Sequence, residues 1–90
     1  MRVVVITGLA QGMGLEVARQ LASAGDAISG FDIDEPGVAS LRQELEKGGG
    51  EHFLTALDIT DRKGILAFRD RVLEKFGRVD VVLSNVGVGF

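Results

Sequence analysis

Three glycines near the amino end are spaced to hold an anion. Gly8, Gly12 and Gly14 give the pattern G-x-x-x-G-x-G, with Thr7 directly before it. Glycine lets a backbone approach a ligand closely and adopt a positive φ, where a Cβ would clash. If a helix begins within this pattern, its first N–H groups have no partner inside the helix, and its dipole adds partial positive charge. A phosphate or pyrophosphate is the natural ligand of such a loop.

The elements on either side of the loop support this interpretation. Residues 2–7 are a β-branched run typical of a strand buried on both faces. From Met13 onward, apolar residues recur at helical spacing, at Val17 and Leu21. The loop is neither G-x-G-x-x-G, because the third position after Gly14 is Val17, nor a P-loop, because no Lys-Ser/Thr pair follows it. An ordinary turn, in which the glycines only permit the bend, is the alternative.

A second candidate for ligand chemistry is Asp32, which ends the next apolar run. A carboxylate about 20 residues beyond such a loop can accept hydrogen bonds from ribose hydroxyls. It also repels a 2′-phosphate, and therefore favours NAD over NADP. The alternative is a strand-end aspartate that acts within a turn. Asp34 is better placed to cap the following helix, which leaves Asp32 freer for a ligand.

The chain alternates between strand and helix patterns. After the first strand we predict helices from Gly12 to Ala24, from Asp34 to the Gly48–Gly50 run, and from about residue 61 to Gly77, with strands at 26–32, 52–57 and 79–84. This alternation indicates βαβ units and a parallel sheet. Because such crossovers are right-handed, we expect a Rossmann-like α/β fold with three helices and four strands in the order 3-2-1-4.

Composition limits the classes of function. The chain has 90 residues, of which 46% are hydrophobic and 26% charged, so we expect one small globular domain. A net charge of −3 without a basic cluster argues against nucleic acid as a partner, and no stretch is long enough to span a membrane. The lack of cysteine suits a reducing cytoplasm. His52 is the sole histidine and the carboxylates are scattered, so we expect no metal site.

Four successive segments match the motifs of a known family. Residues 7–14 match a T-G-x-x-x-G-x-G cofactor loop, and Asp32 matches an NAD-selecting acidic position. Residues 58–61 look like a segment that brackets an adenine, and residues 84–87 are similar to N-N-A-G, with Ser for the first Asn and Val for Ala. In their order and intervals, over essentially the whole chain, these segments resemble the short-chain dehydrogenase/reductase family.

The resemblance implies a dinucleotide-binding half of an enzyme that transfers hydride between NAD and an alcohol or carbonyl. It implies that Asn85 mainly braces the sheet and the cofactor loop. Asp58 or Thr60 can alternatively cap the third helix. The cofactor-binding residues that the resemblance implies are Thr7, Gly8, Gln11, Gly12, Met13, Gly14, Asp32, Ile33, Asp58, Ile59, Asn85, Val86 and Gly87.

The departures from the family concern catalysis. Members carry a catalytic Ser and a Tyr-x-x-x-Lys further along, but this chain has no tyrosine, and Lys47, Lys63 and Lys75 stand in no comparable context. We therefore assign no catalytic residue. We expect residues 1–90 to be a truncated NAD-binding domain that binds the adenosine diphosphate portion of NAD and catalyses nothing. The alternatives are a stand-alone nucleotide-binding or dimerisation module, and a chain shortened by proteolysis, by a frameshift or by the choice of the segment expressed.

The fourth predicted strand is expected to drive association. In the order 3-2-1-4 it lies at an edge of the sheet, with apolar residues from Val81 to Leu83 and only Asp80 to discourage pairing. The first two helices would cover one face of the sheet, and the third helix alone would cover the other. An exposed edge beside an exposed apolar patch predicts a homodimer, or a larger assembly, formed through the fourth strands.

Overall fold

The computed structural model describes residues 1–85. Their four strands form one parallel sheet in the order β3-β2-β1-β4, so the predicted Rossmann-like α/β fold is confirmed. None of the helices in this part of the chain is long and apolar enough to span a membrane. The elements are β1 (Val3–Thr7), α1 (Gly12–Ser23), β2 (Ala27–Asp32), α2 (Glu35–Gly48), β3 (Phe53–Ala56), α3 (Arg62–Phe76) and β4 (Val81–Ser84).

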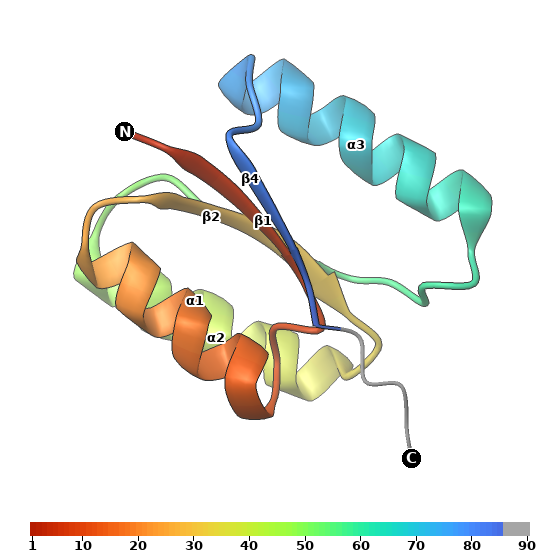
Figure 1. Cartoon of the computed structure of the whole chain (residues 1–90). Helices are drawn as coiled ribbons and strands as arrows, with labels where there is room; N and C mark the ends of the chain where they lie inside the picture. Colours follow the sequence, from red (N-terminus) through yellow and green to blue (C-terminus); the bar gives the residue numbers. More distant parts are fainter. Residues whose placement is uncertain (86–90) are drawn as a thin grey trace.

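The sheet is covered by helices on both faces (Figure 1). α1 and α2 lie on one face, where Val4 and Ile6 of β1 pack with Leu41 of α2. α3 lies on the other, where Val3 of β1 packs with Phe68 of α3. Side chains alternate between the two faces of a strand, so burial on both sides explains why β1 is apolar at successive positions.

α2 and α3 begin with the same cap. The Asp34 carboxylate accepts the Gly37 N–H at 3.2 Å, and the Asp61 carboxylate accepts the Gly64 N–H at 2.9 Å. Each aspartate satisfies one of the N–H groups that a helix start leaves without an intrahelical partner. The prediction that Asp34 caps the second helix is confirmed.

The prediction that Asp58 or Thr60 caps the third helix is wrong. The Asp58 carboxylate accepts hydrogen bonds from the Thr60 N–H at 2.9 Å and the Thr60 hydroxyl at 2.8 Å. It therefore closes a local turn that lies before the helix. Asp61 is the last residue of that turn, and its carboxylate is the one that reaches the first N–H groups of α3.

Two aspartates beside the sheet bind groups at the start of β1. Asp26 pairs with Arg2 at 2.8 Å, and Asp80 accepts the Val3 N–H at 2.7 Å. Hydrogen bonds from the Arg78 guanidinium and from the Val3 N–H lower the pKa of Asp80. Asp80 therefore binds β1 through its carboxylate, a contact that the sequence did not predict.

One buried polar group makes a stability prediction possible. Ser29 of β2 pairs with Val5 of β1 and is fully buried, and its hydroxyl has no hydrogen-bond partner within residues 1–85. Burying a hydroxyl without a partner costs about 1–3 kcal/mol in proteins. We expect Ser29→Ala to raise the free energy of unfolding by about 1 kcal/mol, measured by urea titration. An unchanged or lower stability would show that the hydroxyl contributes a bond.

Candidate functional site

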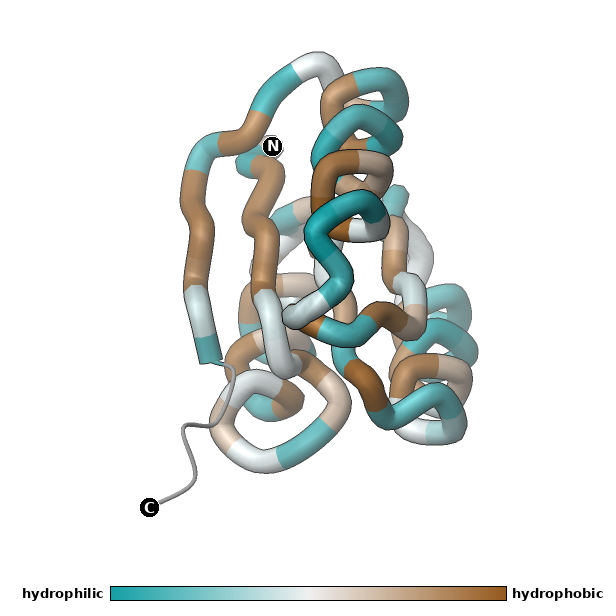
Figure 2. Tube along the Cα trace, turned by 90° about the vertical axis from the view of Figure 1, so that its right-hand side faces the viewer, coloured by the Kyte–Doolittle hydropathy of each residue, from teal (hydrophilic) through white to brown (hydrophobic). Residues whose placement is uncertain are grey.

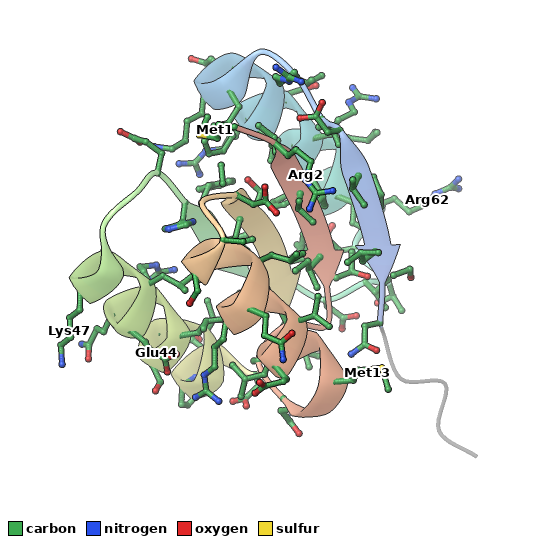
Figure 3. All side chains as sticks on the ribbon, turned by 60° about the vertical axis from the view of Figure 1, so that its left-hand side comes forward. Met1, Arg2, Met13, Glu44, Lys47 and Arg62 are labelled. Carbon is green, nitrogen blue, oxygen red and sulfur yellow. The ribbon has the colours of Figure 1, made fainter. Side chains whose placement is uncertain are left out.

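The carboxyl ends of β1, β2 and β4 open onto one cleft of about 530 Å³, a size typical of small-molecule sites. Figure 3 shows Met13, on the first turn of α1, beside the end of β4. The sequence-predicted residues that line the cleft are Gly8, Gln11, Gly12, Met13, Asp32, Ile33, Asp58, Ile59 and Asn85.

Other residues differ from the sequence-based expectation. Thr7 and Gly14 do not line the cleft; the Thr7 hydroxyl donates to the Ser84 hydroxyl between the strands at 3.4 Å. Phe31 and Leu57 do line it and were not predicted. Both directly precede an aspartate at or beyond the end of a strand, a signal that could have found them. The predicted residues Val86 and Gly87 lie outside the described part of the chain.

The three glycines serve two purposes. Gly8 and Gly12 have positive φ angles of 75° and 56° and turn the chain beside the cleft. A Cβ on Gly14 would lie 2.2 Å from the Gly8 carbonyl oxygen, so this position lets α1 pack against the loop. At Gly12, by contrast, no atom of the described residues lies within 4 Å of where a Cβ would be. The backbone at Gly12 is therefore open to a ligand in the cleft.

α1 differs from the other two helices at its start. Within residues 1–85 no side chain caps α1, and its first turn holds no acidic residue. α2 and α3 each have an aspartate in that position. The first N–H groups of α1, with the positive end of the helix dipole, are thus available at the cleft. This donor set fits a phosphate or pyrophosphate.

The Asp32 carboxylate binds two loops together. One oxygen accepts the Ala10 N–H and the other accepts the Asp34 N–H, each at 3.0 Å. Asp34 caps α2 as predicted, but Asp32 has more partners than the sequence indicated, because both loops fold their backbone donors around this strand end. A carboxylate oxygen has more than one lone pair, so Asp32 can still accept hydrogen bonds from a ligand hydroxyl.

The opposite wall of the cleft is formed after β3. The Thr60 N–H and hydroxyl donate to the Asp58 carboxylate and lower the pKa of Asp58. Ile59, also on this wall, and Ile33, after β2, line the same cleft with exposed apolar side chains. The cleft thus combines an anion-binding end with apolar groups that suit a flat ring.

The Asn85 side chain holds the glycine loop from the β4 side. Its amide donates to the Gly8 carbonyl oxygen at 3.3 Å, and its backbone N–H donates to the Thr7 carbonyl at 3.0 Å. The Gly8 N–H donates in turn to the Phe31 carbonyl of β2 at 2.8 Å. The loop is therefore fixed to both strands that flank β1.

Residues 2–90 match the family model described as short chain dehydrogenase. The chain belongs to the short-chain dehydrogenase family. Among curated members, it is 31% identical to 3beta-hydroxysteroid dehydrogenase 2 of Eggerthella lenta over 93% of its own length and 32% of that protein. It is 36% identical to cis-4-hydroxycyclohexanecarboxylate dehydrogenase of Sinomonas cyclohexanicum, over 97% and 34% of the two chains.

Solved short-chain dehydrogenase structures share the fold. A metagenomic short-chain oxidoreductase in complex with NADP superposes with a TM-score of 0.87 at 35% identity, over 99% of this chain and 40% of the other. A short-chain dehydrogenase/reductase from Burkholderia phymatum in complex with NAD superposes with a TM-score of 0.84 at 32% identity, over 90% of this chain and 29% of the other. The chain spans about a third of the length of the curated relatives that it matches.

The open backbone at Gly12 leads to a binding prediction. Gly12→Ala places a methyl group where a phosphate would approach α1, so we expect the affinity for ADP to fall by about tenfold or more. Gly25→Ala is the matched control, because Gly25 also has a positive φ and an open Cβ position but lies away from the cleft. Each variant should lose about 1 kcal/mol of stability through backbone strain. NMR titration with ADP measures the difference; equal losses of affinity would contradict the prediction.

Proposed function

We propose that this chain is the cofactor-binding part of a short-chain dehydrogenase that transfers hydride between NAD and an alcohol or carbonyl. The observation that carries the proposal is the cleft itself, where the uncapped start of α1 and the Asp32 carboxylate line the same space. Solved family members described as complexes with NADP and with NAD support a nicotinamide dinucleotide as the ligand.

In this proposal, each wall of the cleft binds a different part of the dinucleotide. The first N–H groups of α1 and the backbone of Gly12 bind the pyrophosphate, and Asp32 accepts hydrogen bonds from the adenosine ribose. Ile33 and Ile59 contact the two faces of the adenine. When bound, the nicotinamide ring supplies the site to which hydride is transferred.

We further propose that NAD is preferred over NADP. A 2′-phosphate beside Asp32 would bring two negative groups together in a half-buried site, and it would lose hydration without gaining a donor. Both oxygens of Asp32 are already held in place by backbone N–H groups. The carboxylate therefore cannot swing away to relieve the repulsion without releasing the loop at Ala10.

Catalysis by the 90-residue chain alone is not part of this proposal. The chain contains no tyrosine, the residue type that the family motif uses for proton transfer to the substrate oxygen. We propose that the chain binds the adenosine half of the cofactor and transfers no hydride by itself. A stand-alone nucleotide-binding or dimerisation module is the alternative, and the β4 edge would serve it as the contact between copies.

Cofactor titrations test the proposed preference. We expect NAD to bind more tightly than NADP, with an affinity near 1 mM, about −4 kcal/mol, because only half of the dinucleotide cleft is present. ADP should compete as well as NAD, and no NADH should form with an alcohol. Asp32→Ala should bring the two affinities together. Equal binding of NAD and NADP to the unaltered chain would refute the role of Asp32.

We also propose that the chain associates through β4. Val82 faces the α3 side of the sheet, because it pairs with Val5, and it is 63% exposed. Leu66 and Leu73 of α3, which are 51% and 44% exposed, lie two helical turns apart on one flank of the helix. Arg71, on the opposite flank of the helix, covers Phe53 of β3, so the leucine flank faces β4. Figure 2 shows β4 as an apolar outer strand.

The other edge of the sheet is protected. Arg42 of α2 donates to the Leu54 carbonyl of β3 at 2.7 Å, and the Arg71 guanidinium lies 4.9 Å from the centre of the Phe53 ring. Charged side chains over an edge strand discourage pairing with another chain. This contrast between the edges supports β4, and not β3, as the contact between two copies.

A dilution series measured by light scattering tests the association. We expect a dimer or larger species that dissociates on dilution, and Val82→Lys should shift the equilibrium to monomer by placing a charge in the apolar contact. Ser40→Lys adds the same charge to an exposed position of α2 and should leave the equilibrium unchanged. A folded monomer at every concentration would contradict the proposed contact.

A further inference from the structure

The turn after β2 carries a second carboxylate beside the cleft. Asp34 caps α2 with one oxygen, which accepts the Gly37 N–H at 3.2 Å. Its other oxygen accepts a hydrogen bond from the Gln11 side-chain amide at 3.3 Å. Gln11 lines the cleft, and the Asp34 N–H donates to the Asp32 carboxylate. Asp34 therefore lies one hydrogen bond behind the cleft wall, next to the group assigned to the ribose.

The described residues that line this cleft carry no positive side chain. Their charged members are Asp32 and Asp58. The two side-chain amides are partly committed: Gln11 donates to Asp34, and Asn85 donates to the Gly8 carbonyl. A phosphate group beside Asp32 would thus meet no cation among the lining residues. To accept a hydrogen bond from the Gln11 N–H that now binds Asp34, the phosphate would have to displace the Asp34 carboxylate.

We propose that Asp34 is a second specificity-determining residue, which acts with Asp32 to exclude a 2′-phosphate on the adenosine ribose. It does so in two ways: its charge repels the phosphate, and its bond to Gln11 withholds a donor. This inference rests on the proposed function, because it takes the ribose to lie beside Asp32. Asp34 touches Gln11 and not the ligand, so its role is electrostatic and positional.

Repulsion of this kind has a characteristic dependence on salt. A unit charge several ångströms from a phosphate dianion changes binding by about three- to tenfold in a solvated cleft. Mobile ions screen the interaction, with a Debye length of about 3 Å at 1 M salt. A purely structural contribution of Asp34 through the cap of α2 would not respond to salt in this way.

The test compares two half-site ligands, 5′-AMP and adenosine 2′,5′-bisphosphate, by NMR titration. Asp34→Asn removes the charge and keeps the cap, because Asn caps helices as well as Asp does. We expect this variant to shift the affinity ratio about three- to tenfold toward the bisphosphate, and the shift to shrink in about 1 M NaCl. Asp32→Asn should also shift the ratio, and the double variant should shift it more than either single change.

Asp61→Asn is the matched control. It removes one negative charge from an equivalent cap, whose carboxylate binds the Gly64 N–H at the start of α3, and Asp61 does not line the cleft. This variant should leave the affinity ratio unchanged. Equal shifts in Asp34→Asn and Asp61→Asn would overturn the inference, since they would reflect net charge alone.

The remaining outcomes separate the two proposals. If 5′-AMP binds and Asp32→Asn changes the ratio while Asp34→Asn does not, the inference about Asp34 fails and the proposed function stands. If neither ligand binds the unaltered chain, the proposed nucleotide site is itself wrong. A ratio that shifts in Asp34→Asn but is insensitive to salt would also overturn the electrostatic role.

Discussion

β1 lies between β2 and β4, and all its residues from Val3 to Thr7 are buried. A strand with both edges paired and both faces covered cannot move without disturbing the whole sheet. The glycine loop leaves from the carboxyl end of this strand. There the Gly8 N–H binds the Phe31 carbonyl of β2, and the Gly8 carbonyl accepts the Asn85 amide that follows β4. The position of the loop, and with it the shape of the cleft, depends on β1 being held from both sides.

Carboxylates organise the loops around this fixed end. Asp32 holds the backbone of Ala10 and Asp34, and Asp34 holds the side chain of Gln11. The donors that the cleft offers to an anion are therefore the N–H groups at the start of α1, without a lysine or arginine among the described lining residues. A site of this composition suits a phosphate at the start of α1 and does not suit one beside Asp32. The same acidic groups thus shape the cleft and, in the proposed function, select its ligand.

The two edges of the sheet have opposite characters. Arg42 and Arg71 cover β3, whereas β4 leaves Val82 exposed beside the apolar flank of α3. In the proposed association, a second copy of this chain pairs with the β4 edge. Asn85 lies at the end of β4 and contacts the glycine loop. The free edge of β4 therefore lies next to the cleft.

Local patterns were enough to predict the strand order, the three helices, the glycine loop and the cap at Asp34. The helices, the loop and the cap follow from periodicity or from contacts between residues a few positions apart, and the strand order follows from the right-handedness of βαβ crossovers. The partners of Asp80 and Asp32 could not be predicted in this way. Asp80 binds the N–H of Val3, 77 positions away, and Asp32 binds that of Ala10, 22 positions away. A carboxylate accepts whichever backbone donors come within reach when distant segments meet, and spacing along the chain does not specify which donors those are.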